Sequence, residues 1–152
     1  MAGETQTVLP TPTPDQVTHW LRELGYEERF VGYAMSASVG NTATDMYSMR
    51  DMAVFVLGIR WDAPMLDSGF KGAINWMDVP KMITWLRDVV GDVELADAIE
   101  REIAGLDVYR DQSLAIASLV RQRMVQYDEV YRAATAAQNG DDEPVDVAVE
   151  QR

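Results

Sequence analysis

His19 is the single histidine of the chain and its first candidate for acid–base chemistry. A histidine can act as a general base, because its side chain titrates close to neutral pH. Such a base needs a positioned partner, and no Ser-His-Asp pattern, nucleophile elbow or HExxH motif accompanies it in the sequence. We therefore interpret His19 as a partly exposed helix residue, and we assign no catalytic residue.

Acidic residues offer a second kind of chemistry, because paired carboxylates can exchange protons or hold metal ions. The closest groups along the chain are Glu27-Glu28, Asp92/Glu94/Asp97, Glu100/Glu102 and Asp128-Glu129. A di-metal carboxylate bundle also uses Glu-x-x-His motifs, and the sequence contains none. The groups are therefore interpreted as solvated helix faces, and we expect no metal site and no cofactor.

The composition limits the remaining classes of function. The chain has 152 residues, of which 47% are hydrophobic and 25% charged, as is typical of one folded domain. It has no cysteine, which excludes a disulfide framework, a thiolate nucleophile and a cysteine zinc site. The net charge of −12 argues against binding nucleic acid through its phosphates and against docking on anionic membranes.

The two ends differ in composition from the middle of the chain. The Thr-Pro-Thr-Pro run at 11–14 and the acidic stretch after Asn139 both resemble solvated tails. We predict a flexible N-terminal segment over residues 1–13, a helical domain over 14–138 and a disordered acidic tail over 139–152. The sequence has no apolar run long enough for a transmembrane helix and no signal-peptide pattern at its start, so a cytoplasmic location is expected.

The elements that would position any site are predicted to be helices. Residues 13–16 have the form of a capping box and precede an apolar stripe over 17–24. A second helix is predicted from Glu27 to about Ser38. A third begins after Ser48, and its apolar run 53–57 is interpreted as a buried helix rather than a strand, because no comparable second strand is evident. Residues 61–76 are predicted to form an irregular connection.

Helix signals are clearer in the C-terminal half. Asp78, Asp92 and Asp107 each precede an apolar periodic segment and can cap a helix. The last of these segments keeps one apolar stripe over about 25 residues. The sequence therefore predicts an all-α fold, a single bundle-like domain of about five to seven helices.

Part of the predicted helical domain, residues 17–59, resembles a sterile alpha motif domain. The similarity is carried by Trp20-Leu21, Phe30, Asp51-Met52 and Leu57-Gly58-Ile59. The interval from Asp51 to Gly58 is about two residues longer than in that family. Arg60-Trp61-Asp62 stands where the family usually has a basic turn. We do not assign the family, and the resemblance implies only a protein-binding helical module.

Methionine and tryptophan are the most unusual residues of the sequence, which contains nine methionines and four tryptophans. Methionine is common at adaptable binding surfaces, and tryptophan at interface hot spots. We therefore predict a partner-binding surface in the segment 46–85, with core packing and a small apolar ligand pocket as the alternatives. The candidate residues are Met49, Met52, Trp61, Met65, Phe70, Trp76, Met77 and Trp85.

These observations favour a function exerted by contact. We hypothesise a non-catalytic cytoplasmic accessory or regulatory protein that binds a protein partner, for instance an enzyme. The long last helix would serve as its scaffold or as a face for homo-oligomer formation. One alternative is a small carboxylate-dependent enzyme, or a small subunit of a metabolic enzyme. A further alternative is an acidic nucleic-acid mimic that inhibits a DNA-binding protein.

Overall fold

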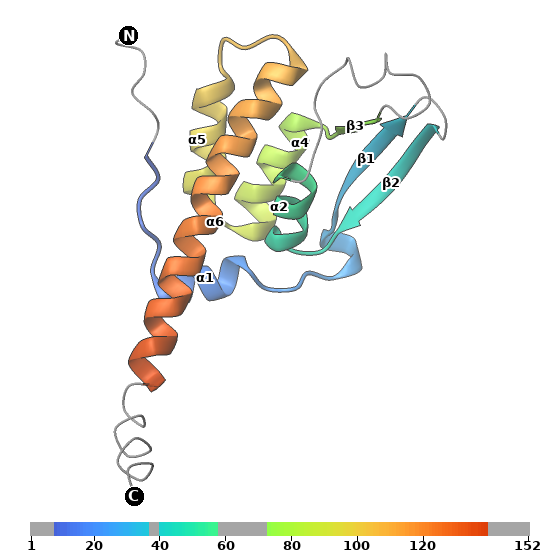
Figure 1. Cartoon of the computed structure of the whole chain (residues 1–152). Coiled ribbons are helices and arrows are strands. Elements are labelled where there is room, and N and C mark those ends of the chain that lie inside the picture. The colour runs from blue at the N-terminus through green and yellow to red at the C-terminus, as the bar shows by residue number, and fades with distance from the viewer. Residues whose placement is uncertain (1–7, 37–39, 58–72, 140–152) are drawn as a thin grey trace, which may run out of the picture.

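A three-stranded antiparallel sheet stands beside the helices of the chain (Figure 1). The computed structural model describes residues 8–36, 40–57 and 73–139. In these ranges the sheet accompanies five α-helices, so the fold is mixed α/β. The sequence prediction of an all-α fold is therefore wrong.

The helices of the described ranges differ greatly in length. They are α1 (Pro14–Trp20), α2 (Met49–Leu57), α4 (Val79–Thr84), α5 (Val93–Ile103) and α6 (Tyr109–Asn139). A short 3-10 turn, η2 (Tyr26–Glu28), precedes the sheet, and a π-helical segment, η4 (Trp85–Val90), continues α4. The strands are β1 (Phe30–Ser36), β2 (Gly40–Met46) and β3 (Ala73–Trp76), in the order β2-β1-β3.

The strand β1 replaces the helix that the sequence predicts from Glu27 to about Ser38. Its residues alternate between two faces, with Phe30 and Gly32 buried and Tyr33 exposed. A Cβ at Gly32 would lie 2.6 Å from the end of the Phe55 ring on α2, so the sheet can pack this closely only on a glycine. The glycine hides the strand pattern in the sequence, because it puts no apolar side chain at an inward position.

Two further expectations for this half of the chain have mixed outcomes. Residues 53–57 are helical as predicted and form part of α2, but only Ala53, Phe55 and Val56 of this run are buried, whereas Val54 is exposed. Residues 58 and 59 lie outside the described ranges. The irregular connection predicted over 61–76 is wrong for its last four residues, which form β3, and β2 lies where no element was predicted. The strands β1 and β2 also fall within residues 17–59, so this stretch is not the helical module that the sterile alpha motif resemblance implies.

The predicted caps are confirmed where the structure shows their hydrogen bonds. Thr13 and Gln16 form the capping box of α1, and Ser48 Oγ accepts a hydrogen bond from the Asp51 N–H at the start of α2. The carboxylates of Asp78 and Asp92 accept the N–H groups of Lys81 and Leu95. These contacts lie within four residues of chain, which explains why the sequence predicts them correctly.

The helix α6 is the longest helix of the described ranges and packs against α1, α2 and α5 (Figure 1). Residues 8–13, which the sequence places in the N-terminal tail, lie against the same helix. The Leu9 N–H donates to Gln122 Oε1 at 2.8 Å, and Gln126 Nε2 donates to the Leu9 carbonyl at 2.7 Å. Leu9 itself is buried.

Candidate partner-binding site

Three aromatic side chains form a row at the β3 side of the sheet. The ring centroids of Tyr33 and Trp76 are 6.1 Å apart, and those of Trp76 and Tyr109 are 6.4 Å apart. Tyr33 and Trp76 face each other across the β1–β3 pair, while Tyr109 comes from the first turn of α6. We call these three residues the aromatic row.

A shallow pocket of about 320 Å³ opens beside this row. It is lined by Tyr33, Met35, Asn41 and Trp76, which together span all three strands. Tyr33 and Met35 lie on the face of β1 opposite to buried Gly32, which packs on α2. The pocket therefore lies on the outer face of the sheet, and Figure 1 shows α2, α4 and α6 on the other side.

The exposed tryptophan is held in place by Tyr109. The Met77 N–H donates to Tyr109 Oη at 2.9 Å, and Tyr109 Oη donates to the Asn75 carbonyl at 3.2 Å. One phenol thus ties the backbone on both sides of Trp76 to α6. Burial raises the pKa of this phenol above its ordinary value, so it keeps its donor proton at neutral pH. A tryptophan whose backbone is fixed in this way loses less conformational entropy when a partner binds it.

The structure divides the predicted surface residues into three groups. Met49, Met52, Met77 and Trp85 are buried in the core. Trp76 is 37% exposed and lines the pocket. Trp61, Met65 and Phe70 lie outside the described residues.

Sequence reasoning did not single out Tyr33, Met35, Asn41 or Tyr109 for this site. Tyr33 and Met35 share one face only in a strand, and the sequence analysis assigned them to a helix. The signal that could have identified them is the two-residue spacing of Val31, Tyr33 and Met35, which is typical of one face of a strand.

A second cluster of functional groups is buried between α5 and α6. Arg123 and Asp92 are both fully buried, and they form a two-pronged ion pair with N–O distances of 2.8 and 2.7 Å. The remaining N–H groups of Arg123 donate to the Pro10 carbonyl, Gln126 Oε1 and Glu94 Oε1. All five donors of this guanidinium therefore have acceptors.

The Asp92 carboxylate is equally well satisfied. Its oxygens accept from Arg123, from the Leu95 N–H at the start of α5 and from Tyr127 Oη at 2.8 Å. A carboxylate offers about four acceptor positions, and these contacts occupy them. Arg123 and Asp92 thus keep no free donor or acceptor for a substrate, so we assign this ion pair a structural role.

Tyr127 makes the stability of the protein sensitive to alkaline pH. Burial, together with the charge of Asp92, holds the pKa of its phenol well above the ordinary value of 10.0. Above that pH the unfolded chain releases this proton while the folded chain retains it, so folding stability falls as pH rises. We expect the stability difference between wild type and Tyr127→Phe to shrink by about 1.4 kcal/mol per pH unit above about pH 10.

Urea unfolding of both proteins at several pH values measures this difference. At neutral pH, Tyr127→Phe should be less stable by about 1–3 kcal/mol, because Asp92 loses a hydrogen-bond donor. The comparison with the variant cancels the titration of other tyrosines and of lysines. A stability difference that stays constant up to about pH 11 would contradict the assignment.

The other candidates for chemistry do not come together into a site in the described part of the chain. His19 is exposed in the last turn of α1, and its Nε2 lies 3.2 Å from Nη1 of Arg22. Among the residues that the structure describes, no group of three His, Asp or Glu side chains is arranged to hold a metal ion. None of the described helices has both the length and the apolar character required to cross a membrane.

Comparison of the chain with protein-family models, curated proteins and solved structures gives no match.

Proposed function

We propose that the protein is a non-catalytic accessory or regulatory protein that binds a partner protein on the outer face of its sheet. The observation that carries the proposal is the pairing of Tyr33 and Trp76 beside an apolar pocket, with both side chains 37% exposed. Tryptophan and tyrosine are the residues that most often dominate binding energy in protein interfaces. The cytoplasm is the compartment in which we would seek the partner.

The partner that suits this face is an extended segment carrying basic residues and a large apolar side chain. The strand β2 forms one edge of the sheet, and most of its residues are exposed, so an extended segment can pair with its backbone. Asn41 and Ala43 lie opposite Met35 and Tyr33, so the outer face continues from the pocket to this edge. An apolar side chain of such a segment would enter the pocket.

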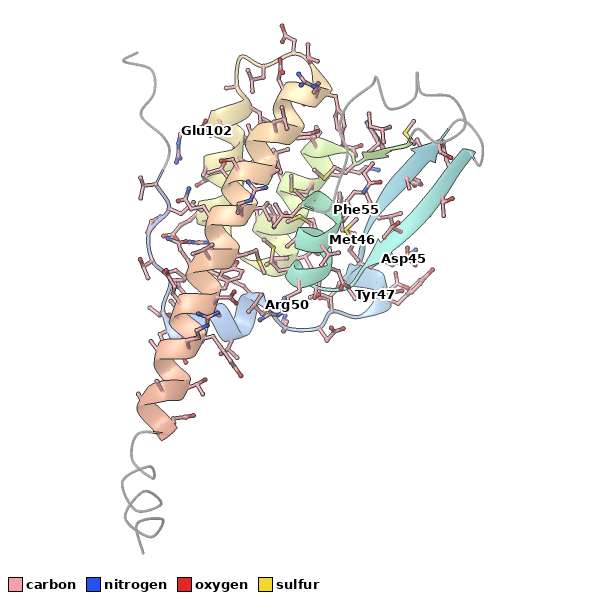
Figure 2. The ribbon with its side chains drawn as sticks, in the orientation of Figure 1. Asp45, Met46, Tyr47, Arg50, Phe55 and Glu102 are labelled. Carbon is pink, nitrogen blue, oxygen red and sulfur yellow. The ribbon has the colours of Figure 1, made fainter. Side chains whose placement is uncertain are left out.

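Charge favours a basic segment over an acidic one. The chain carries 25 acidic residues against 13 basic ones, which gives it a negative field that attracts cationic partners. On β2, Asp45 is exposed next to buried Met46, and one of its carboxylate oxygens already contacts Arg29 Nε at 3.3 Å. In Figure 2, Met46 and Phe55 lie between the sheet and α2, whereas Asp45 lies on the side of β2 away from α2.

Site-specific photo-crosslinking in the cells that make the protein tests the proposal. The photoreactive residue p-benzoylphenylalanine is placed at position 43, where Ala43 is exposed opposite Tyr33. A matched variant carries it at position 93, where Val93 is 45% exposed at the start of α5. We expect a discrete protein adduct from position 43 and not from position 93.

The role of the aromatic pair is tested by adding Trp76→Ala to the position-43 variant. The adduct should fall at least about tenfold, which is the loss expected when a hot-spot tryptophan is truncated. The captured protein is then purified, and its direct binding to wild type and to Trp76→Ala is compared by calorimetry. Identical adducts from both positions, or an adduct that Trp76→Ala leaves unchanged, would contradict the proposal.

A further inference from the structure

The outward face of α6 carries a row of exposed residues directly opposite the core. Leu114 is 47% exposed and Val125 is 51% exposed, although both are apolar. Eleven residues span three turns of an α-helix to within about 20°, so Leu114, Val125 and Ala136 point in the same direction. Between them the exposed residues Ser118, Arg121, Glu129 and Arg132 fall close to the same line. We call these seven residues the α6 stripe.

Charges on the stripe are not neutralised by other residues that the structure describes. Neither Arg121 nor Glu129 forms an ion pair with another residue of the described ranges. Arg121 stands four residues before Val125, and Glu129 stands four residues after it. The two charges of opposite sign are therefore placed symmetrically about an exposed valine.

We infer that this stripe is the interface for a second copy of the chain, with the two α6 helices antiparallel and a two-fold axis at Val125. This arrangement puts Arg121 opposite Glu129 of the second copy, and it does so twice because the interface is symmetric. Leu114 meets Ala136 of the second copy, and Val125 meets its own counterpart. The apolar residues and the charges are thus complementary in the same register.

A parallel pairing of the same stripe is disfavoured by its charges. It would bring Arg121 against Arg121 and Glu129 against Glu129, and like charges in contact weaken an interface. In the antiparallel register Ser118 instead faces Arg132 of the second copy, so no charged residue of the stripe lies directly opposite a like charge. This inference does not depend on the sheet surface proposed above, since it uses a different face of the molecule.

A charge-reversal series measured by sedimentation equilibrium tests the register. The wild-type protein should show a mass twice the 17.0 kDa of one chain at concentrations above its dissociation constant. Arg121→Glu and Glu129→Arg should each raise the dissociation constant by about tenfold or more, because each places like charges in contact. The double variant Arg121→Glu/Glu129→Arg should return it to within about threefold of wild type.

Disulfide formation between introduced cysteines provides an independent test, because the chain has no cysteine of its own. Val125→Cys should form a disulfide-linked dimer rapidly under mild oxidation, since the two copies of position 125 meet at the axis. Ser118→Cys is the matched control on the same stripe. Its two copies would be about 21 Å apart in an antiparallel pair, which is too far for a disulfide.

The outcomes separate the possibilities cleanly. Rapid linkage at position 125 but not at 118, together with recovery in the double charge variant, supports the proposal. A 17.0 kDa species at all concentrations, linkage at 118 as fast as at 125, or a double variant as weak as the single ones would overturn it. Circular dichroism of each variant checks that the exposed substitutions leave the fold intact.

Discussion

Replacing Arg123 by methionine is expected to lower the free energy of unfolding by about 3–5 kcal/mol, because Asp92 would remain buried without its counter-ion. Both side chains are fully buried, and their two N–O contacts are 2.8 and 2.7 Å long. The variant also loses the hydrogen bond from Arg123 to the Pro10 carbonyl, which ties residues 8–13 to α6. The loss is a large part of the 5–15 kcal/mol by which folded domains are usually stable.

A double variant distinguishes the lost ion pair from simple loss of packing. Arg123→Met/Asp92→Asn removes both charges, while the asparagine Oδ1 can still cap α5 and its Nδ2 can donate to Tyr127 Oη. It should therefore be more stable than Arg123→Met alone by about 1–3 kcal/mol, as buried charge pairs are strongly non-additive. Guanidinium unfolding followed by circular dichroism provides the measurement.

An exposed arginine provides the control for this series. Arg101 lies in the last turn of α5, and Arg101→Met should change stability by no more than about 0.5 kcal/mol. If Arg123→Met proved as mild as this control, the ion pair would not have the structural role assigned to it.

The buried ion pair also shows where sequence reasoning reaches its limit. Asp92 was predicted as a helix cap, and it is one, because a cap depends on neighbours in the chain. Its pairing with Arg123 joins residues 31 positions apart, and helix periodicity does not contain such a contact. A signal was nevertheless present, because Arg123 lies on the apolar stripe of α6, four residues before buried Tyr127. A lone arginine in that position requires a buried acid elsewhere.

The strands were missed for a related reason. A helix is stabilised by contacts close in sequence, and its caps and apolar stripe are visible locally, whereas a strand depends on partners elsewhere in the chain. In β2 the residues are mostly polar and exposed, so no apolar alternation marks the strand. The β3 strand pairs with β1, although β2, α2 and residues 58–72 lie between them in the sequence. Nothing in the four residues of β3 indicates that distant register.

Residue type predicted the candidate surface only in part, because tryptophan and methionine suit both cores and interfaces. Trp85 and Trp76 illustrate the difference. Trp85 is 5% exposed, its ring lies 5.5 Å from that of Phe30, and its Nε1–H donates to the Glu28 carbonyl at 2.7 Å. Trp76 is more than one-third exposed beside the pocket. The structure therefore assigns the first to the core and leaves the second exposed on the face where we propose that a partner binds.

Alanine substitution at these two tryptophans is expected to give opposite results. Trp85→Ala should lower the free energy of unfolding by about 3–5 kcal/mol, because it empties a core site and leaves the Glu28 carbonyl unpaired. Trp76→Ala should cost no more than about 2 kcal/mol, since much of the ring is already in water. Chemical unfolding of both variants measures these losses.

Partner binding completes the comparison, because stability alone does not separate the two roles. The photo-crosslinked adduct from position 43 should be lost in Trp76→Ala, which remains folded. The variant Trp85→Phe keeps the apolar ring but loses the indole N–H, so it should retain the adduct at temperatures where it is folded. The reverse pattern, with binding lost in Trp85→Phe and retained in Trp76→Ala, would move the interface from the outer face of the sheet to the side occupied by the helices.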